Sequence, residues 1–316
     1  MSTDLFTFGE ALSVFIASDS DSVMSAQKYE RVTAGAELNV AVTLSRLGLK
    51  SQYFSRFGND QLGSVMLADI EAEGVDISLV KRVDSFTGAM VRNSGKSQVV
   101  EISYLRKGSA ASTIEPQDIL DSYISSAKWL HTTGITCAIS ATGAATVKYA
   151  LSKAASLAIK SSFDLNIRRR LWSEADAKKV LAPLASNIEL LIGGEDEYQV
   201  VFGSNEPKKI LAEANKRGCR IAVMTKGDQM IRYSIDGDYA EINPPKVVAV
   251  DPVGSGDAFT GGVIAALLSG LSVEQALEQG SICGALVASM FGDWTGIPTG
   301  KLGLVDKEII AKVRGN

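Results

Sequence analysis

Short apolar runs alternate with longer amphipathic segments along most of this chain. The segment after Gly35 has Leu38, Ala41 and Leu44 at helical spacing and Gly48 at its end, which predicts a helix. Apolar runs of four to six residues between such segments are typical of buried strands, so the alternation favours a mostly parallel α/β sheet with helices on both faces. The expected strands are 5–9, 52–57, 75–80, 129–133, 162–165, 188–192 and 220–225, and the other expected helices are 62–73, 140–160, 175–184, 195–202, 207–216, 256–269 and 273–291.

The alternation breaks between residues 86 and 106. There 86–92 and 99–105 are β-like runs joined by Asn93-Ser94-Gly95-Lys96, a sequence typical of a hairpin turn. With short strands expected at 12–17 and 27–32, they predict a small separate sheet, contributed by about 12–33 and 86–106. We expect this sheet to be a lid that excludes water from a ligand site. A second hairpin around Asp236-Gly237 should lie at an edge of the main sheet, and the whole of 1–316 is expected to be one doubly wound domain.

Residues 251–262, Asp-Pro-Val-Gly-Ser-Gly-Asp-Ala-Phe-Thr-Gly-Gly, follow an apolar run that ends at Val250. We expect a strand, a tight glycine turn and the start of a helix. Gly254 and Gly256 lack the Cβ atoms that would keep a ligand from the backbone, and first-turn amides attract an anion, most often a phosphate. The turn therefore predicts a phosphate site.

Asp257 is the unexpected residue of this turn, because a carboxylate repels the anion that the glycines attract. One interpretation is a general base that takes a proton from an attacking hydroxyl during phosphoryl transfer. The other is a residue that only stabilises the helix N-terminus, by about 0.3 to 1 kcal/mol. The loop lacks the Walker A spacing, and no glycine fingerprint follows the first strand, which disfavours a nicotinamide-dependent dehydrogenase.

Composition narrows the class of protein. A chain of 316 residues, 46% hydrophobic and 22% charged, is typical of a globular protein, and the net charge of −4 argues against a nucleic-acid partner. No segment has the features of a signal peptide or a membrane span. Cys137, Cys219 and Cys283 are far apart, which indicates buried thiols in a reducing compartment, and we expect a cytoplasmic location. The single histidine, His131, ends an apolar strand and is expected to be a packing residue.

Polar residues gather just after the predicted strands, where an open α/β sheet binds its ligand. Arg106 in the lid and Arg168 after a strand suggest an acidic substrate beside a nucleotide, because a neutral sugar would leave two buried cations unpaired. For either arginine alone a surface salt bridge is the alternative, and the place of Arg168 directly after an apolar strand favours a binding role for it. The other polar residues at this edge are Asn39, Asp164, Asn166, Glu195, Glu197 and Thr225.

The chain resembles the ribokinase-like (PfkB) sugar kinase family over nearly its whole length. The family's C-terminal signature is matched by residues 251–259, and its N-terminal glycine signature by Ala-Gly-Ala-Glu-Leu-Asn-Val-Ala at 34–41, followed by 46–48 and 58–63. Within the family, 104–110, 131–135 and 164–168 resemble 2-keto-3-deoxygluconate kinases.

The resemblance implies a role for each candidate site residue. Asp257 would be the base that activates the sugar's primary hydroxyl, and the amides of Gly254, Ser255 and Gly256 would form the anion hole. The sugar acid would be held by Gly35, Asn39, Tyr104, Arg106 and Arg168, and the nucleotide by Thr225, Lys226, Gly227, Gly254 and Gly256.

The same resemblance implies ATP and Mg²⁺ as cofactors. Of the family's Asn-x-x-Glu motif only Glu197 remains, with Gly194 in place of the asparagine, so Glu197 would contact the metal through water. Asp251 and the 289–293 region resemble the family's monovalent-cation site, which implies K⁺, although Val253 replaces the usual threonine.

The sequence thus predicts an ATP-dependent kinase of the terminal hydroxyl of 2-keto-3-deoxy-D-gluconate. The alternatives are a kinase of this fold that acts on fructose, ribose or a nucleoside, and a non-catalytic sugar or nucleotide sensor. The expected partners are the small sugar acid, ATP and a second copy of the chain, paired through the lid sheet. No nucleic acid or membrane partner is expected.

Overall fold

The computed structural model describes residues 3–94, 101–300, 303–305 and 307–314. The chain forms two compact units. The first comprises Met1–Phe6 with Ile114–Pro244, and the second comprises Thr7–Thr113 with Pro245–Asn316.

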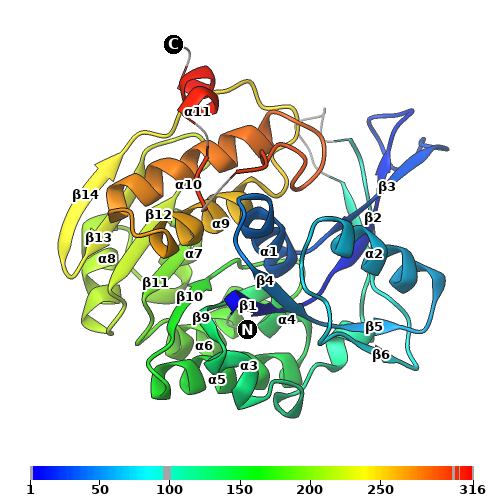
Figure 1. The fold of residues 1–316 in the computed structure, drawn as a ribbon, viewed down its shortest axis with the longest axis horizontal. Helices are drawn as coiled ribbons and strands as arrows, with labels where there is room; N and C mark the ends of the chain where they lie inside the picture. Colours follow the sequence, from blue (N-terminus) through cyan, green and yellow to red (C-terminus); the bar gives the residue numbers. More distant parts are fainter. Residues whose placement is uncertain (1–2, 95–100, 301–302, 306, 315–316) are drawn as a thin grey trace. The chain divides into compact units, whose positions relative to one another are not determined.

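The first unit is an open α/β sheet whose strands follow the order β14-β13-β12-β11-β10-β9-β1 (Figure 1). Strands β9 to β12 are parallel, and β13 and β14 form the antiparallel hairpin predicted at the edge. The parallel strands are buried almost throughout, as their unbroken apolar runs predict. The strands are β1 (Thr3–Phe8), β9 (Ala127–Thr133), β10 (Lys160–Asp164), β11 (Leu190–Gly194), β12 (Ile221–Thr225), β13 (Ile231–Ile235) and β14 (Asp238–Ile242).

Helices follow these strands, and hydroxyl side chains fix where several of them begin. Ser140 accepts the amide of Gly143 at the start of α5, and Ser173 accepts that of Asp176 at the start of α6. Helix α5 is shorter than predicted, because the chain turns at Ala158 (φ 54°) into β10. The helices are α3 (Asp121–Ser125), α4 (Gly134–Ile139), α5 (Ala141–Ser156), α6 (Glu174–Leu184), α7 (Glu195–Phe202) and α8 (Pro207–Lys216), with a 3₁₀ turn, η2 (Pro116–Asp118).

In the second unit, helix α9 packs against both α1 and α10 (Figure 1). Gly261 of α9 lies against Thr43 of α1, and Gly262 lies against Gly280 and Cys283 of α10, so small residues on α9 permit close contact on two sides. The helices of this unit are α1 (Ala36–Arg46), α2 (Gln61–Ala72), α9 (Ser255–Leu268), α10 (Val273–Ala288) and α11 (Lys307–Arg314), with η1 (Ala110–Thr113) and the short strands β4 (Ser51–Phe54), β5 (Arg56–Gly58) and β6 (Lys81–Val83).

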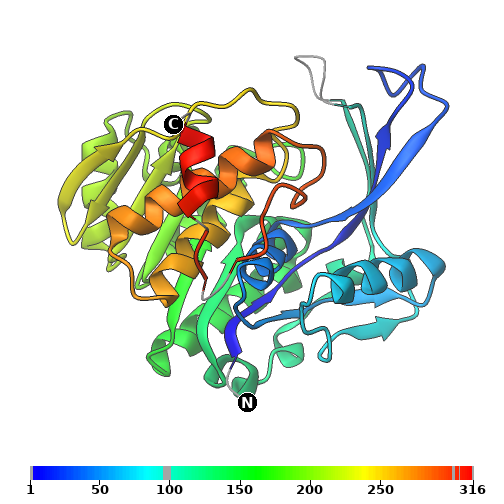
Figure 2. The ribbon, with the colours of Figure 1, turned by 45° about the horizontal axis from the view of Figure 1, so that its top comes forward.

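The predicted small sheet is present in the second unit. Its strands β2 (Leu12–Ala17), β3 (Tyr29–Ala34), β7 (Ala89–Arg92) and β8 (Ile102–Leu105) follow the order β3-β2-β7-β8, and Figure 2 shows β2 and β3 side by side along their length. One face carries a cluster of buried side chains that includes Leu12, Val14 and Met90. Strands β7 and β8 are antiparallel, as a hairpin requires, and the predicted turn at 93–96 lies partly outside the described residues.

Three predictions of elements were wrong. The strand expected before the glycine turn is absent from 243–250, and Val248 is 86% exposed, because this apolar run lies on the surface and pairs with no described strand. The strand expected at 52–57 is two strands that meet at Ser55, and the extended segment 75–80 precedes β6 instead of forming it.

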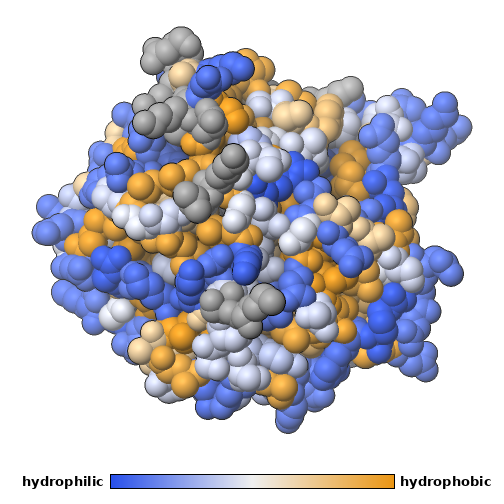
Figure 3. Space-filling model, in the orientation of Figure 1, coloured by the Kyte–Doolittle hydropathy of each residue, from blue (hydrophilic) through white to orange (hydrophobic). Residues whose placement is uncertain are grey.

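The three cysteines are buried, as expected, and none of them forms a disulfide. Burial raises the pKa of Cys219 and Cys283 to about 12. Among the described helices, none has the length and hydropathy needed to cross a bilayer. On the face drawn in Figure 3, hydrophobic and hydrophilic residues are intermixed.

Candidate active site

The glycine turn caps helix α9 as the sequence predicts. Gly254 is the N-cap residue with φ 81°, and a Cβ there would lie 2.6 Å from the carbonyl oxygen of Asp293, so only glycine fits. A Cβ at Gly256 would meet nothing within 4 Å, so this residue borders open space. The Ser255 amide donates to the Pro252 carbonyl oxygen at 3.2 Å, which leaves Gly256 the better placed of the predicted anion donors.

Asn39 joins the first turns of two helices. Its Nδ2 donates to Asp257 Oδ2 at 2.7 Å, and its Oδ1 accepts the amide of Gly35 at 3.3 Å. A Cβ at Gly35 would lie 2.5 Å from the carbonyl oxygen of Glu10, so glycine is required there too. The side chains of Asn39 and Asp257 are both buried, and a donated amide favours the ionised carboxylate that a general base must have. The structure therefore brings together Gly35, Asn39 and Asp257.

Asp293 contacts Asn39, which the sequence did not predict, since the 289–293 region was expected only to resemble the monovalent-cation site. Asn39 Nδ2 also donates to its Oδ2, at 3.2 Å, and the side chain is buried. Asp293 lies in an irregular segment, where no periodicity or glycine signature marks it. The signal was only a carboxylate between a glycine and a tryptophan.

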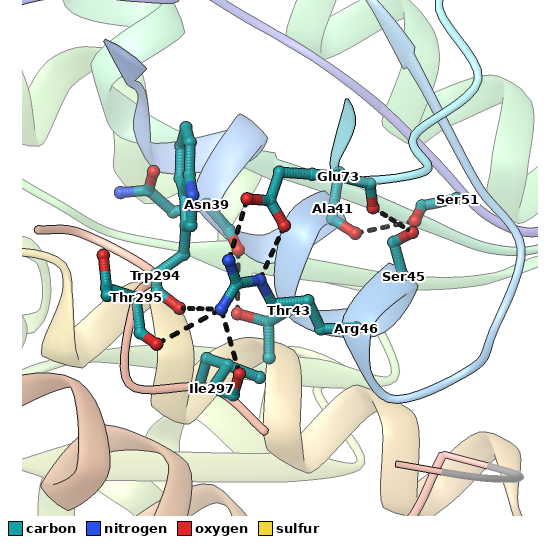
Figure 4. A network of polar contacts seen from close by, with 10 residues as sticks. All are labelled: Asn39, Ala41, Thr43, Ser45, Arg46, Ser51, Glu73, Trp294, Thr295 and Ile297. Atoms are coloured by element: carbon teal, nitrogen blue, oxygen red, sulfur yellow. Dashed lines mark hydrogen bonds and ion pairs between the residues drawn. The ribbon is translucent and has the colours of Figure 1, made fainter. Parts of the chain in front are cut away.

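Arg46 holds the segment that follows Asp293 (Figure 4). Its Nη1 donates to the main-chain oxygens of Trp294, Thr295 and Ile297 at 3.0 to 3.2 Å. Glu73 balances the charge, accepting from Nε at 2.6 Å and Nη2 at 2.8 Å. The position of Asp293 is thus linked to the end of helix α1.

Arg106 is paired within its own unit. It is buried and forms an ion pair with Glu10, and its guanidinium carbon lies 5.0 Å from the ring centroid of Tyr104. Burial raises the pKa of Glu10, while the Arg106 charge lowers it. The argument that a neutral sugar would leave two buried cations unpaired was therefore wrong, because Glu10 already neutralises Arg106.

Asp251 was predicted to bind a monovalent cation. It is buried, and the guanidinium of Arg92 donates to its Oδ2 at 2.5 Å. Its Oδ1 accepts the Val253 amide at 3.2 Å. A carboxylate engaged on both oxygens, one of them by a permanent cation, does not fit a metal ligand at this position.

The first unit gathers polar residues at the carboxyl ends of β10, β11 and β12, as predicted. Asp164 ends β10 and accepts the amide of Asn166, which has φ 34°. Glu197 in α7 accepts the amides of Ile167 at 2.6 Å and Gly194 at 2.7 Å. Burial raises the pKa of Glu197, and these two amides oppose the rise. Glu197 thus fastens the segment after β10 to the start of α7.

The residues predicted to bind the nucleotide lie at and after the end of β12. Thr225 ends the strand beside Gly194 of β11, and Gly227 has φ 57° with open space where a Cβ would stand. Lys226 is half-exposed and lies 3.4 Å from Glu195 Oε1. A glycine and a lysine at this edge suit a chain of phosphates.

Arg168 is exposed on the same unit. Burial raises the pKa of Glu197, and the charge of Arg168 opposes this rise. The neighbouring Arg169, by contrast, pairs with Glu174 and Asp196. Arg168 is therefore not the buried cation that the sequence predicted, although its exposed charge remains suited to an anionic ligand.

His131 is the packing residue predicted. It is fully buried, with Nδ1 2.8 Å from the Ser162 hydroxyl, and burial lowers its pKa to about 3. Within the described residues no group of three or more His, Cys, Asp or Glu side chains could hold a metal. Mg²⁺ in phosphoryl-transfer sites is bound by one or two carboxylates and the substrate phosphates, so a single Glu197 is compatible with it.

The sequence model of the pfkB family carbohydrate kinases matches residues 2–300. The chain belongs to this family. It is 32% identical to a 2-dehydro-3-deoxygluconokinase from Bacillus subtilis (strain 168), over 95% of this chain and 94% of that protein. It is 29% identical to a fructokinase from Klebsiella pneumoniae, over 84% and 88% of the two chains. The crystal structure of a PfkB protein from Polaromonas sp. JS666, 30% identical, matches 100% of both chains with a TM-score of 0.86. The ribokinase-like fold predicted from the sequence is confirmed.

Proposed function

We propose that this sugar kinase transfers the γ-phosphoryl group of ATP to the terminal hydroxyl of 2-keto-3-deoxy-D-gluconate. The contact of Asn39 with Asp257 at the N-terminus of α9 carries the proposal, because it sets an oriented carboxylate beside amides that attract phosphate. The choice of acceptor is supported by the likeness to the Bacillus subtilis 2-dehydro-3-deoxygluconokinase.

In the proposed reaction Asp257 accepts the proton of the terminal hydroxyl while that oxygen attacks the γ-phosphorus. The bond from the γ-phosphorus to the β–γ bridging oxygen breaks, and ADP leaves with the electron pair. Amides at the start of α9, that of Gly256 foremost, stabilise the charge on the transferred group. Asn39 keeps Asp257 ionised and oriented.

Residues of the first unit would bind the cofactor. Thr225, Lys226 and Gly227 would contact the nucleotide phosphates. Arg168 would pair with the carboxylate of the sugar acid. Kinases of this family use ATP with Mg²⁺. Glu197 would hold that Mg²⁺ through water, and the bound ion neutralises phosphate charge.

A neutral sugar is the second candidate acceptor, and the pairing of Arg106 with Glu10 favours it. A guanidinium that is already neutralised offers less to a substrate carboxylate. A screen of ADP release over sugar acids, both C4 epimers of the keto acid, neutral sugars and nucleosides distinguishes the candidates. We expect the highest kcat/KM with the keto acid. A higher kcat/KM with fructose or ribose would make that neutral sugar the proposed acceptor instead.

The variant Asp257→Asn tests the mechanism and separates an enzyme from a sensor. It should bind ATP and sugar as the parent does, while kcat falls by at least about 10²-fold, the lower range for a positioned base. Undiminished turnover would exclude Asp257 as the base. Binding without ADP release from any acceptor in the parent protein would identify a sensor.

We also propose a cytoplasmic homodimer formed through the four-stranded sheet. Leu105, 59% exposed, lies on the face opposite the buried cluster. Sedimentation should give a dimer for the parent and a monomer for Leu105→Glu, and identical profiles would count against this interface.

A further inference from the structure

A buried ion pair joins the small sheet of the second unit to the glycine turn. Arg92 is the last residue of β7, between Ile16 of β2 and Ile102 of β8. Its Nη2 donates to Asp251 Oδ2 at 2.5 Å, and both side chains are 1% exposed. A pair removed from water to this degree is maintained only when each charge has its partner.

The oxygens around Asp251 are already engaged. Asp251 Oδ1 accepts the Val253 amide at 3.2 Å. The main-chain oxygen of Ala288, at the end of α10, accepts the amides of Val250 at 2.7 Å and Asp251 at 3.1 Å. Arg92 Nη1 donates to the main-chain oxygen of Asn93 at 3.1 Å. A monovalent metal needs several oxygen ligands, and here these oxygens hold N–H donors.

The charge of Asp251 matters because of its place in the chain. It lies three residues before Gly254, the N-cap of α9, and an uncompensated carboxylate there would oppose a phosphate at the helix N-terminus. The Arg92 guanidinium, 2.5 Å from Asp251 Oδ2, compensates this negative charge. A metal cation at the same carboxylate would meet the repulsion of that guanidinium.

We propose that Arg92 is the built-in counter-ion of the 251–257 loop, a positioning residue that lets the enzyme work without a monovalent metal cation at Asp251. The consequence for catalysis rests on the kinase activity proposed above, whereas the consequence for the fold does not. The substitution of valine for the family's usual threonine at Val253 agrees with the loss of a metal ligand there.

The parent protein gives the first test. Thermal unfolding and ADP release are measured in KCl, in NaCl and in tetramethylammonium chloride at equal ionic strength. We expect the same Tm in all three, and kcat/KM values that agree within about twofold, because the charge at Asp251 is already compensated. Saturable activation by K⁺, or a rise of Tm specific to K⁺, would overturn the proposal.

Variants give the second test. Arg92→Met should lower Tm and reduce kcat/KM by at least about tenfold, because a buried carboxylate is left without its partner. The double variant Arg92→Met with Asp251→Asn should recover much of the Tm that Arg92→Met loses. In the variant Arg92→Ala, millimolar guanidinium or K⁺ should raise Tm, whereas tetramethylammonium should not. The control is Arg31→Met, which breaks the partly exposed pair between Arg31 of β3, in the same sheet, and Asp69 of helix α2. It should leave all salt responses unchanged.

An Arg92→Met protein with the Tm and turnover of the parent would overturn the proposal. So would a double variant no more stable than Arg92→Met. The Tm series needs neither ATP nor sugar, so a wrong acceptor shows itself only as absent ADP release, with the Tm pattern intact.

Discussion

The side-chain amide of Asn39 donates to Asp257 at 2.7 Å and to Asp293 at 3.2 Å, so one donor orients two carboxylates from distant parts of the chain. Asn39→Ala should therefore lower kcat by roughly 10-fold to 100-fold, the range expected for a lost hydrogen bond to a charged group. An unchanged kcat in Asn39→Ala would contradict this role. Thr43→Val, one turn further along α1, is the control.

Alanine substitutions at Gly254 and Gly256 form a matched pair of variants. Gly254→Ala places a Cβ 2.6 Å from the Asp293 carbonyl oxygen at φ 81°, and the left-handed conformation alone costs about 1 to 2 kcal/mol. We expect lower stability and lower turnover. Gly256→Ala meets no atom within 4 Å, so its Tm should match the parent while the affinity for ATP falls. Calorimetric titration with ATP and thermal unfolding separate the two effects, and an unchanged affinity in Gly256→Ala would remove Gly256 from the phosphate site.

The single histidine predicts how stability depends on pH. Burial lowers the pKa of His131 to about 3, below its ordinary value of 6.5, so the folded state resists protonation. Its contribution to the free energy of unfolding is complete above pH 6.5 and is lost below it, by about 1.4 kcal/mol per pH unit. Denaturant unfolding between pH 7 and pH 5 should therefore show a steeper fall for the parent than for His131→Gln. Equal slopes would refute the assignment.

Arg168 tests the acidic substrate. Arg168→Ala should raise KM for 2-keto-3-deoxygluconate by about 10-fold or more, because a charge-assisted contact is lost, and should change KM for a neutral sugar little. Arg169→Ala is the control, since Arg169 is committed to Glu174 and Asp196. Equal losses on both kinds of acceptor would remove the argument for a sugar acid.

Much of the architecture could be predicted from periodicity and caps. Helices α7 and α8 begin and end where the pattern placed them, and the hairpin around Asp236-Gly237 lies at the sheet edge. The strand predicted for the apolar run that ends at Val250 is absent. Its three valines would form a strand only if a neighbouring element buried them, and burial depends on tertiary structure.

The candidate site could be predicted in part. Glycines and the carboxylate of the 251–257 turn carry a local signature, and so does the start of α1. The partners of buried charged side chains have no such local signature in the sequence. Arg92 pairs with Asp251 across 159 positions of the sequence, and Arg106 pairs with Glu10, a residue that no motif marks. Only the fold decides which opposite charges are neutralised.

The hydrogen bonds from Arg46 to the segment after Asp293 restrict how the length of this segment can vary. The three acceptors are main-chain oxygens, which every amino acid provides, so these hydrogen bonds do not by themselves require particular side chains at Trp294, Thr295 and Ile297. The spacing is not free, because an inserted or deleted residue would move at least one oxygen out of reach of Nη1. The length of this segment should therefore stay constant, while substitutions should be accepted at the exposed Thr295 sooner than at the buried Ile297.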